Sequence, residues 1–283
     1  MKRFVRQMID YCHAGGAPLD AGMIVFDLDD TLLRDDRTVS DETVQVMREA
    51  ARRGIHIVPA SGRAQASMQG VVERLGCVSC YISCNGGEIY NAAHQPLQKV
   101  AFSTKEALDI AAFLEQEDCY FQVYAGDKFF YNKECGYAES YAQATLLSGQ
   151  CVGKLTDFIH QPTAKVLAMD EPERIAKLLE KSRKVFAGRA SVTCSKPYFL
   201  EFNPPEATKG NALVWCARHL GVDISRTIAF GDSLNDVSML SAAGRGVAMK
   251  NAREDVLAMD FAVTHLTNDQ DGVADYITKH ILT

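Results

Sequence analysis

The chain has 283 residues, a formal net charge of −6 and 47% hydrophobic residues. This length is enough to bury a large core and suggests about two domains. The net negative charge excludes a global basic field that would attract nucleic acid or anionic lipid, so any attraction for anions has to be local. No apolar run approaches the ~20 residues that cross a bilayer, and the basic N-terminus lacks the apolar core of a signal peptide. We therefore expect a cytoplasmic protein without a nucleic-acid or membrane partner.

The chain contains nine cysteines, an odd number spread widely along it. This pattern argues against the disulfide framework of a secreted protein. Cys77 and Cys80 form a C-x-x-C pair, but no second pair and no nearby pair of histidines accompanies it. We expect buried, reduced thiols here rather than a zinc or redox site.

The first expected strand begins at Met23, after an N-terminal extension of residues 1–22. Because Met23 immediately precedes this strand, we expect the native chain to begin there or slightly upstream. The apolar run ends in Asp27, and Asp29 and Thr31 follow closely. A strand buried on both faces carries charges only where it leaves the sheet, which in parallel sheets is where ligands bind. An acidic turn with an Asx cap is the simpler interpretation of this segment alone.

Two later apolar runs end in the same way. Residues 55–60 lead into Ser61 and Gly62, and residues 227–230 lead into the segment 231–236. A helical pattern follows each run, so each is typical of a β-then-α unit. Strands of one parallel sheet would bring these polar ends to a common edge. Lys209 begins another helical stretch and can direct a cation toward that edge.

The remaining elements follow from capping and turn signals. Ser40 and Gly54 bound a predicted helix, and Gly76 ends a second one. A turn at 85–87 closes the first half of the core. The pattern then changes to mixed elements: helices at 104–116 and 171–182, a hairpin around 126–127 and a strand at 165–169. Strand–helix alternation resumes near residue 192.

The ordered motifs resemble those of the haloacid dehalogenase superfamily of phosphohydrolases, most closely its Cof-type members of class IIB. The likeness covers roughly residues 23 to 283. It is carried by the segments 27–31, 61–63, 85–87, 209–210, 231–236, 246–249, 251–252 and 271–273. The family usually has glycine in place of Asp30 and often in place of Glu206. Aspartate tolerates turn conformations, and Glu206 either alters the loop before Lys209 or adds a carboxylate near the substrate.

This resemblance implies an α/β fold with a doubly wound, mostly parallel, Rossmann-like sheet. We expect the core to comprise residues 23–87 and 191–283, with a C2B-type α+β cap inserted at 88–190. Such a cap closes over the phosphate site and excludes water. For Tyr124 and Tyr131 we expect packing between cap and core rather than contact with the substrate.

The resemblance also implies the chemistry of the site. Asp27 would be the nucleophile that forms an aspartyl-phosphate. Mg²⁺ would be bound by the Asp27 side chain, the Asp29 backbone carbonyl and Asp232. The side chain of Asp29 would act as general acid and base, and we expect its pKa to be raised for that task.

The phosphate-binding groups are expected to be Ser61, Gly62, Lys209 and Asn235. Thr31 and Asp236 would hold other site residues in place without touching the substrate. Asp236 would do so by holding Lys209 or a metal-bound water. Arg63 fits a surface or supporting position as well as a substrate contact. Singly, Ser61 and Asn235 are also ordinary helix-capping residues, and Lys209 an ordinary solvated lysine.

The leading hypothesis is a Mg²⁺-dependent phosphatase that acts on small phosphorylated metabolites, such as sugar phosphates or phosphorylated cofactors, as a monomer or weak homo-oligomer. One alternative is a phosphosugar mutase of the same fold. Another is a non-catalytic sensor in which phosphorylated Asp27 signals to a partner. The acid at Asp29 and the large insert favour the enzyme over the sensor.

Overall fold

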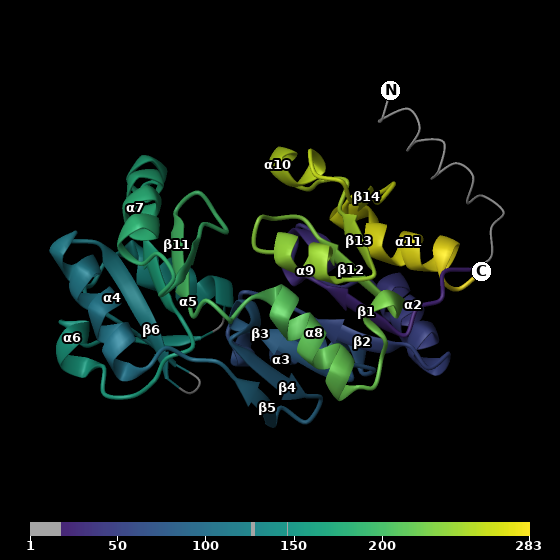
Figure 1. Ribbon diagram of the computed structural model, residues 1–283, viewed down its shortest axis with the longest axis horizontal. Coiled ribbons are helices and arrows are strands. Elements are labelled where there is room, and N and C mark those ends of the chain that lie inside the picture. The colour runs from purple at the N-terminus through teal and green to yellow at the C-terminus, as the bar shows by residue number, and fades with distance from the viewer. Residues whose placement is uncertain (1–17, 126–127, 146) are drawn as a thin grey trace.

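The computed structural model describes residues 18–125, 128–145 and 147–283. Its two lobes, a core and a cap, lie side by side (Figure 1). The core contains a parallel sheet in the order β14-β13-β12-β1-β2. Its strands are β1 (Met23–Phe26), β2 (His56–Pro59), β12 (Thr227–Gly231), β13 (Arg245–Ala248) and β14 (Ala262–Val263). The predicted doubly wound α/β class is confirmed.

The central strands of this sheet are covered on both faces. Every residue of β1 and β12 is buried, as expected for continuous apolar runs in a parallel sheet. The helices around the sheet are α2 (Asp41–Arg52), α3 (Gln69–Leu75), α8 (Lys209–His219), α9 (Val237–Ala242), α10 (Glu254–Leu257) and α11 (Gly272–His280). The Ser40 hydroxyl caps α2 by accepting a hydrogen bond from the backbone N–H of Thr43 at 3.0 Å, as predicted.

A second, antiparallel sheet extends the core. It consists of β3 (Cys80–Ser83), β4 (Glu88–Asn91) and β5 (Pro96–Lys99). Two isolated parallel bridges join the β3 region to the β2 region, and the hydrophobic side chains of β4 pack in the core cluster. The hairpin β4–β5 therefore belongs with the core.

The cap is a six-stranded sheet in the order β10-β11-β9-β6-β7-β8. Its strands are β6 (Tyr120–Ala125), β7 (Lys128–Tyr131), β8 (Ser148–Cys151), β9 (Val166–Met169), β10 (Ser191–Thr193) and β11 (Phe199–Asn203). Its helices are α4 (Thr104–Gln116), α5 (Gly136–Thr145), α6 (Leu155–Phe158) and α7 (Pro172–Val185). The strands β6 and β7 pair as the predicted antiparallel hairpin.

The two faces of the cap sheet differ, because side chains alternate along each strand. Phe121, Val166 and Leu200 pack with α4, α6 and α7 in one hydrophobic cluster. Their neighbours Tyr120 and Leu167 pack on the other face, with α5 and with residues of the core. Residues on this second face are therefore placed to meet the core.

The sheets divide the chain differently from the predicted cap range 88–190. The hairpin β4–β5 pairs with β3, and β10 and β11 pair into the cap sheet through β9. Pairing between strands, which the local pattern does not reveal, decides both boundaries. We therefore propose a cap from about residue 100 to 203 inside a discontinuous core.

Most of the predicted extension, residues 1–17, lies outside the described residues. Leu19 and Gly22 pack on the core through backbone hydrogen bonds to His280 and Arg226, both 2.7 Å long.

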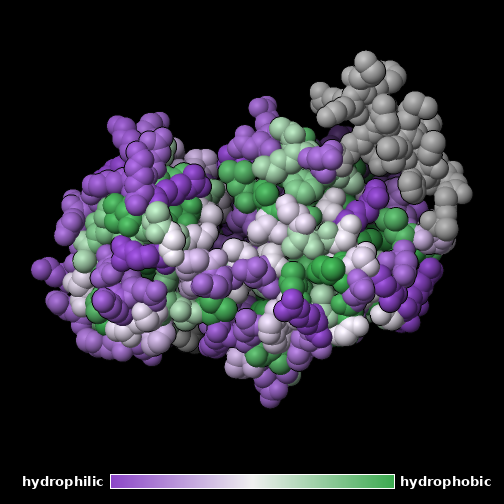
Figure 2. Space-filling model, viewed as in Figure 1, coloured by the Kyte–Doolittle hydropathy of each residue, from purple (hydrophilic) through white to green (hydrophobic). Residues whose placement is uncertain are grey.

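Figure 2 shows hydrophilic residues over the outer side of α7, whose Ile175 and Leu178 are buried. Within the described ranges, the structure has no helix whose length and hydrophobicity would suit a bilayer.

Candidate active site

The carboxyl ends of the core strands bring the predicted polar residues together. Asp27 follows β1, Ser61 follows β2 and Asp232 follows β12, and all three are buried. Asp29 and Asp30 lie in the turn after Asp27, where Asp30 has a left-handed backbone with φ of 59°. Aspartate tolerates this conformation, so the departure from glycine leaves the turn intact.

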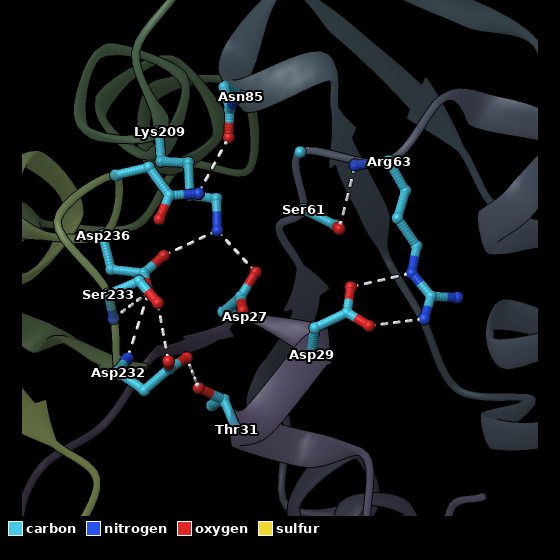
Figure 3. Close-up of polar contacts among 12 residues, drawn as sticks. Asp27, Asp29, Thr31, Ser61, Arg63, Asn85, Lys209, Asp232, Ser233 and Asp236 are labelled. Carbon is cyan, nitrogen blue, oxygen red and sulfur yellow. Dashed lines mark hydrogen bonds and ion pairs between the residues drawn. The ribbon is translucent and has the colours of Figure 1, made fainter. Parts of the chain in front are cut away.

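Lys209 begins α8 and is fully buried between two carboxylates. Its Nζ lies 2.5 Å from Oδ1 of Asp27 and 2.6 Å from Oδ1 of Asp236 (Figure 3). Burial by itself would lower the pKa of Lys209, but the charges of Asp236 and Asp27 outweigh it and raise that pKa. Lys209 is therefore a permanent cation beside Asp27, and it does not line the cleft.

Asp236 is held on both of its oxygens. Oδ1 accepts from Lys209, and Oδ2 accepts from the backbone N–H groups of Asp232 and Ser233, both at 3.0 Å. A Cβ at position 231 would lie only 2.5 Å from the Cβ of Asp236, so this approach needs Gly231. Asp236 thus shapes the loop that carries Asp232 and holds Lys209, and its supporting role in catalysis stays a prediction.

Asp232 is oriented by two hydroxyl groups. Thr31 Oγ1 donates to Oδ1 at 2.9 Å, and Ser233 Oγ donates to Oδ2 at 2.6 Å. The sequence prediction included Thr31 but missed Ser233, which lies directly after Asp232 in the motif. Each oxygen of Asp232 keeps a further lone pair for another ligand.

The carboxylates of Asp27, Asp232 and Asp236 bring ligand oxygens within 4.8 Å of one another. Burial raises the pKa of Asp27 well above its ordinary value, Lys209 lowers it, and Asp236 and Asp232 raise it further. Burial and then the charge of Asp236 raise the pKa of Asp232 to about 7. Three buried acids with one lysine therefore fit a hard divalent cation, for which carboxylate oxygens are the preferred ligands.

Asp29 turns away from this cluster and pairs with Arg63 (Figure 3). Arg63 Nε donates to Oδ2 at 2.8 Å and Nη2 donates to Oδ1 at 2.6 Å. Burial would raise the pKa of Asp29, but the hydrogen bond and charge of Arg63 outweigh it, so the pKa is lowered. The expectation of a raised pKa is wrong for this arrangement, because the sequence left the position of Arg63 open.

The segment after β2 contributes neutral donors. Ser61 and Gly62 line the cleft with Asn235. A Cβ on Gly62 would lie 3.0 Å from Oδ1 of Asn85, so glycine allows this close approach. Asn235 donates through Nδ2 to the same oxygen of Asn85 at 3.0 Å. Of the predicted phosphate donors, Ser61, Gly62 and Asn235 thus line the same cleft as Asp27, whereas Lys209 does not.

Between core and cap lies a cleft with a cavity volume of about 200 Å³. The core contributes mostly charged and polar groups, and the cap contributes an apolar wall that includes Tyr137, Tyr141, Leu167, Met169 and Phe199. Glu206 is exposed and does not line the cleft, so it adds no carboxylate there. Tyr124 and Tyr131 do not line it either.

Sequence reasoning missed a buried ion pair of the cap, Lys165 and Glu201, which also lines the cleft. A signal was available, because each charge adjoins or interrupts an otherwise apolar strand. Charges at such positions are rarely buried unless they are paired.

Comparison with known proteins agrees with this geometry. The profile of the haloacid dehalogenase-like hydrolases matches residues 24–277. The phosphatase YwpJ of Bacillus subtilis is 34% identical over 286 residues, which cover 92% of this chain and 99% of the relative. The HMP-PP phosphatase of Serratia proteamaculans is 31% identical, and the match covers 81% of this chain and 84% of the relative. A solved haloacid dehalogenase-like hydrolase from Bacillus subtilis superposes with a TM-score of 0.82 at 31% identity, covering 92% of this chain and 99% of that one. The chain therefore belongs to the haloacid dehalogenase-like hydrolase family and is one of its phosphatases.

Proposed function

We propose that the protein is a Mg²⁺-dependent phosphatase of small phosphorylated metabolites that works through an aspartyl-phosphate on Asp27. The observation that carries this proposal is the buried cluster around Asp27. Its carboxylate lies 2.5 Å from the Lys209 ammonium and shares a 4.8 Å ligand cluster with Asp232. Both features suit a carboxylate that has to approach a negatively charged phosphate.

The resident ion would be held by the side chains of Asp27 and Asp232, with the backbone carbonyl of Asp29 as the third protein ligand. When bound, Mg²⁺ supplies positive charge that offsets the repulsion between a carboxylate and a phosphate. Asp236 is less suited to bind it, because Lys209 and two backbone N–H groups already occupy its oxygens.

In the first half-reaction, an Asp27 oxygen attacks phosphorus while the bond from phosphorus to the leaving oxygen breaks. Asp29 gives that oxygen a proton, which requires the Asp29 carboxyl group to leave Arg63 and take up a proton first. Ser61, Asn235 and the backbone N–H of Gly62 donate to the phosphoryl oxygens. Lys209 offsets charge at Asp27 throughout, since its ammonium remains protonated.

In the second half-reaction, Asp29 takes a proton from a water that attacks the phosphorus. The bond between phosphorus and the Asp27 oxygen breaks, and inorganic phosphate and free carboxylate result. This step requires a base close to the phosphoryl group, and Asp29 lies only two residues from Asp27.

The leaving group would lie against the apolar wall of the cap. Tyr141, Leu167 and Phe199 would contact its body, while the phosphate lies at the polar side of the cleft. A cavity of about 200 Å³ suits a small metabolite. The name of the Serratia relative, an HMP-PP phosphatase, supports a phosphorylated small molecule as the substrate class.

The direct test is phosphate release from p-nitrophenyl phosphate and from a panel of phosphorylated metabolites. We expect turnover with Mg²⁺, loss on addition of a chelator and recovery when Mg²⁺ is restored. Acid quenching during turnover should give a protein heavier by one phosphoryl group, with the added mass on the peptide that contains Asp27. Turnover without that adduct, or an adduct on another residue, would contradict the mechanism.

A further inference from the structure

A buried ion pair of the cap lies beside the phosphate donors of the core. Lys165 and Glu201 are 2% and 3% exposed, and Nζ lies 3.1 Å from Oε1. The lysine also lies 5.2 Å from the ring centroid of Tyr124. Replacing such a pair by apolar residues is often neutral or even stabilising, so cap stability alone is a weak reason to have it. The contacts that the pair makes with the core suggest another reason.

The first contact runs from the lysine to the peptide group between Gly62 and Arg63. Lys165 Nζ donates to the carbonyl oxygen of Gly62 at 2.7 Å. The N–H of the same peptide group, on Arg63, donates to Ser61 Oγ at 3.1 Å. Because a trans peptide is planar, fixing its carbonyl also fixes the direction of its N–H. Ser61 Oγ therefore accepts from the backbone and keeps its own O–H proton to donate into the cleft.

The second contact runs from the glutamate through two amides. Asn85 Nδ2 donates to Glu201 Oε2 at 3.2 Å, and Asn235 Nδ2 donates to Asn85 Oδ1 at 3.0 Å. Glu201 thereby sets the orientation of the Asn85 amide, with its oxygen toward Asn235. One N–H of Asn235 is used by this chain, and its second N–H is left for a ligand in the cleft.

Both chains of contacts begin at one ion pair of the cap and end at a donor that lines the same cleft as Asp27. We propose that Lys165 and Glu201 are positioning residues for phosphoryl transfer. They orient the hydroxyl of Ser61 and the amide of Asn235 toward one phosphate without touching it. The inference rests on the proposed function, and it adds that phosphate affinity depends on how the cap is placed on the core.

The test replaces both charges together, because removing one alone would leave the other buried and unpaired. Lys165→Met with Glu201→Gln removes the contact to Gly62 but keeps an acceptor for Asn85. Lys165→Met with Glu201→Leu removes both contacts. We expect kcat/KM to fall about 10- to 100-fold in the first variant, as for other small misplacements of binding groups. The loss should be larger in the second variant.

Two readouts separate positioning from a structural role or a substrate contact. The affinity for inorganic phosphate in the presence of Mg²⁺, measured by calorimetry, should weaken in the same order as kcat/KM, while the thermal midpoint stays close to that of the wild type. The loss should be similar for p-nitrophenyl phosphate and acetyl phosphate, because the phosphate is common to both. A contact to the leaving group would instead give different losses.

The matched control is an exposed ion pair of the same cap, Lys133 and Asp118, whose Nζ–Oδ1 distance is 2.8 Å. Lys133→Met with Asp118→Asn should leave both readouts unchanged. If the buried pair cannot be replaced without unfolding, Asn85→Gly tests the second contact alone. The backbone of Asn85 has a positive φ of 56°, which glycine adopts readily, and this substitution leaves the Lys165–Glu201 ion pair in place. That variant should also bind phosphate more weakly.

Folded double variants, or a folded Asn85→Gly variant, with the phosphate affinity and kcat/KM of the wild type would overturn the inference and leave the proposed function intact. A wild-type protein that neither binds phosphate nor hydrolyses any phosphomonoester would overturn the proposed function and this inference together.

Discussion

The core and the cap present different chemistry to the same cleft. From the core come the Asp27 cluster, with its buried lysine, and the Asp29–Arg63 pair. From the cap come an apolar wall, several hydroxyl side chains, Lys196 and the ion pair of Lys165 and Glu201. Together with the proposed divalent cation, the core groups would suit a phosphate, which every phosphomonoester carries. The cap wall would suit the body of a substrate, which differs from one phosphomonoester to the next.

This contrast indicates that changes in the core should affect all substrates alike and by large factors, whereas changes in the cap wall should be small and selective. The cap ion pair should resemble the core in this respect, because its contacts lead to the proposed phosphate donors Ser61 and Asn235.

Removal of the proposed nucleophile should have the largest effect. Asp27→Asn should lower kcat on every substrate by about 10⁴-fold or more, as losses of nucleophiles do in other enzymes. The variant should fold at least as stably in the absence of metal, because the burial of the Asp27 charge and its repulsion by Asp236 and Asp232 outweigh the attraction of Lys209. Phosphate-release assays and thermal unfolding measure the two effects. Comparable activity in the variant would show that Asp27 is not the nucleophile.

Loss of the proposed acid and base should be smaller and should depend on the leaving group. Asp29→Asn should slow alkyl phosphates by about 10²- to 10⁴-fold. With p-nitrophenyl phosphate the first step needs little acid catalysis, so a burst of nitrophenol equal to the enzyme concentration should precede slow turnover. Rapid-mixing absorbance measures it. The absence of a burst, with equal losses for both kinds of substrate, would assign Asp29 a purely structural role.

The proposed metal ligand at the end of β12 can be tested through the Mg²⁺ requirement. Asp232→Asn should raise the Mg²⁺ concentration for half-maximal activity by about 100-fold or more, since loss of an outer partner alone costs about 10- to 100-fold. A Mg²⁺ titration at saturating substrate measures this effect. Thr31→Val removes only the hydroxyl that orients Asp232 and serves as a milder comparison. It should raise the Mg²⁺ concentration for half-maximal activity by a smaller factor. An unchanged requirement in Asp232→Asn would place the ion elsewhere.

Much of the core site was predictable because three of its central residues follow directly from the end of a strand. Asp27, Ser61 and Asp232 end runs that are apolar enough to be recognised, and parallel pairing alone brings them together. Capping signals were equally local, as the hydrogen bond from the Thr43 N–H to Ser40 shows. The resemblance to a known family then supplied the roles.

The cap contacts were not predictable, because they depend on how the cap packs against the core. Lys165 and Gly62 are 103 positions apart, and no local pattern relates them. The state of Asp29 likewise depends on which way the long side chain of Arg63 turns. The cap boundaries that we propose differ from the predicted ones for a related reason: strand–helix alternation resumes near residue 192, but β10 pairs with β11 and β11 pairs with β9 of the cap sheet.

The smallest effect is expected on the apolar wall. Tyr198 lines the cleft, is 40% exposed, and packs edge-on against Phe199 with ring centroids 4.8 Å apart. Tyr198→Ala should raise KM by about 2- to 10-fold for substrates with a large leaving group, since one aromatic contact is lost. Acetyl phosphate, whose leaving group is too short to reach the ring, should respond less. Steady-state kinetics on both substrates measure the difference. Equal losses for the two substrates would mean that Tyr198, like the ion pair, acts on the phosphate site. The difference between uniform and substrate-selective effects would then separate parts of the cap rather than core from cap.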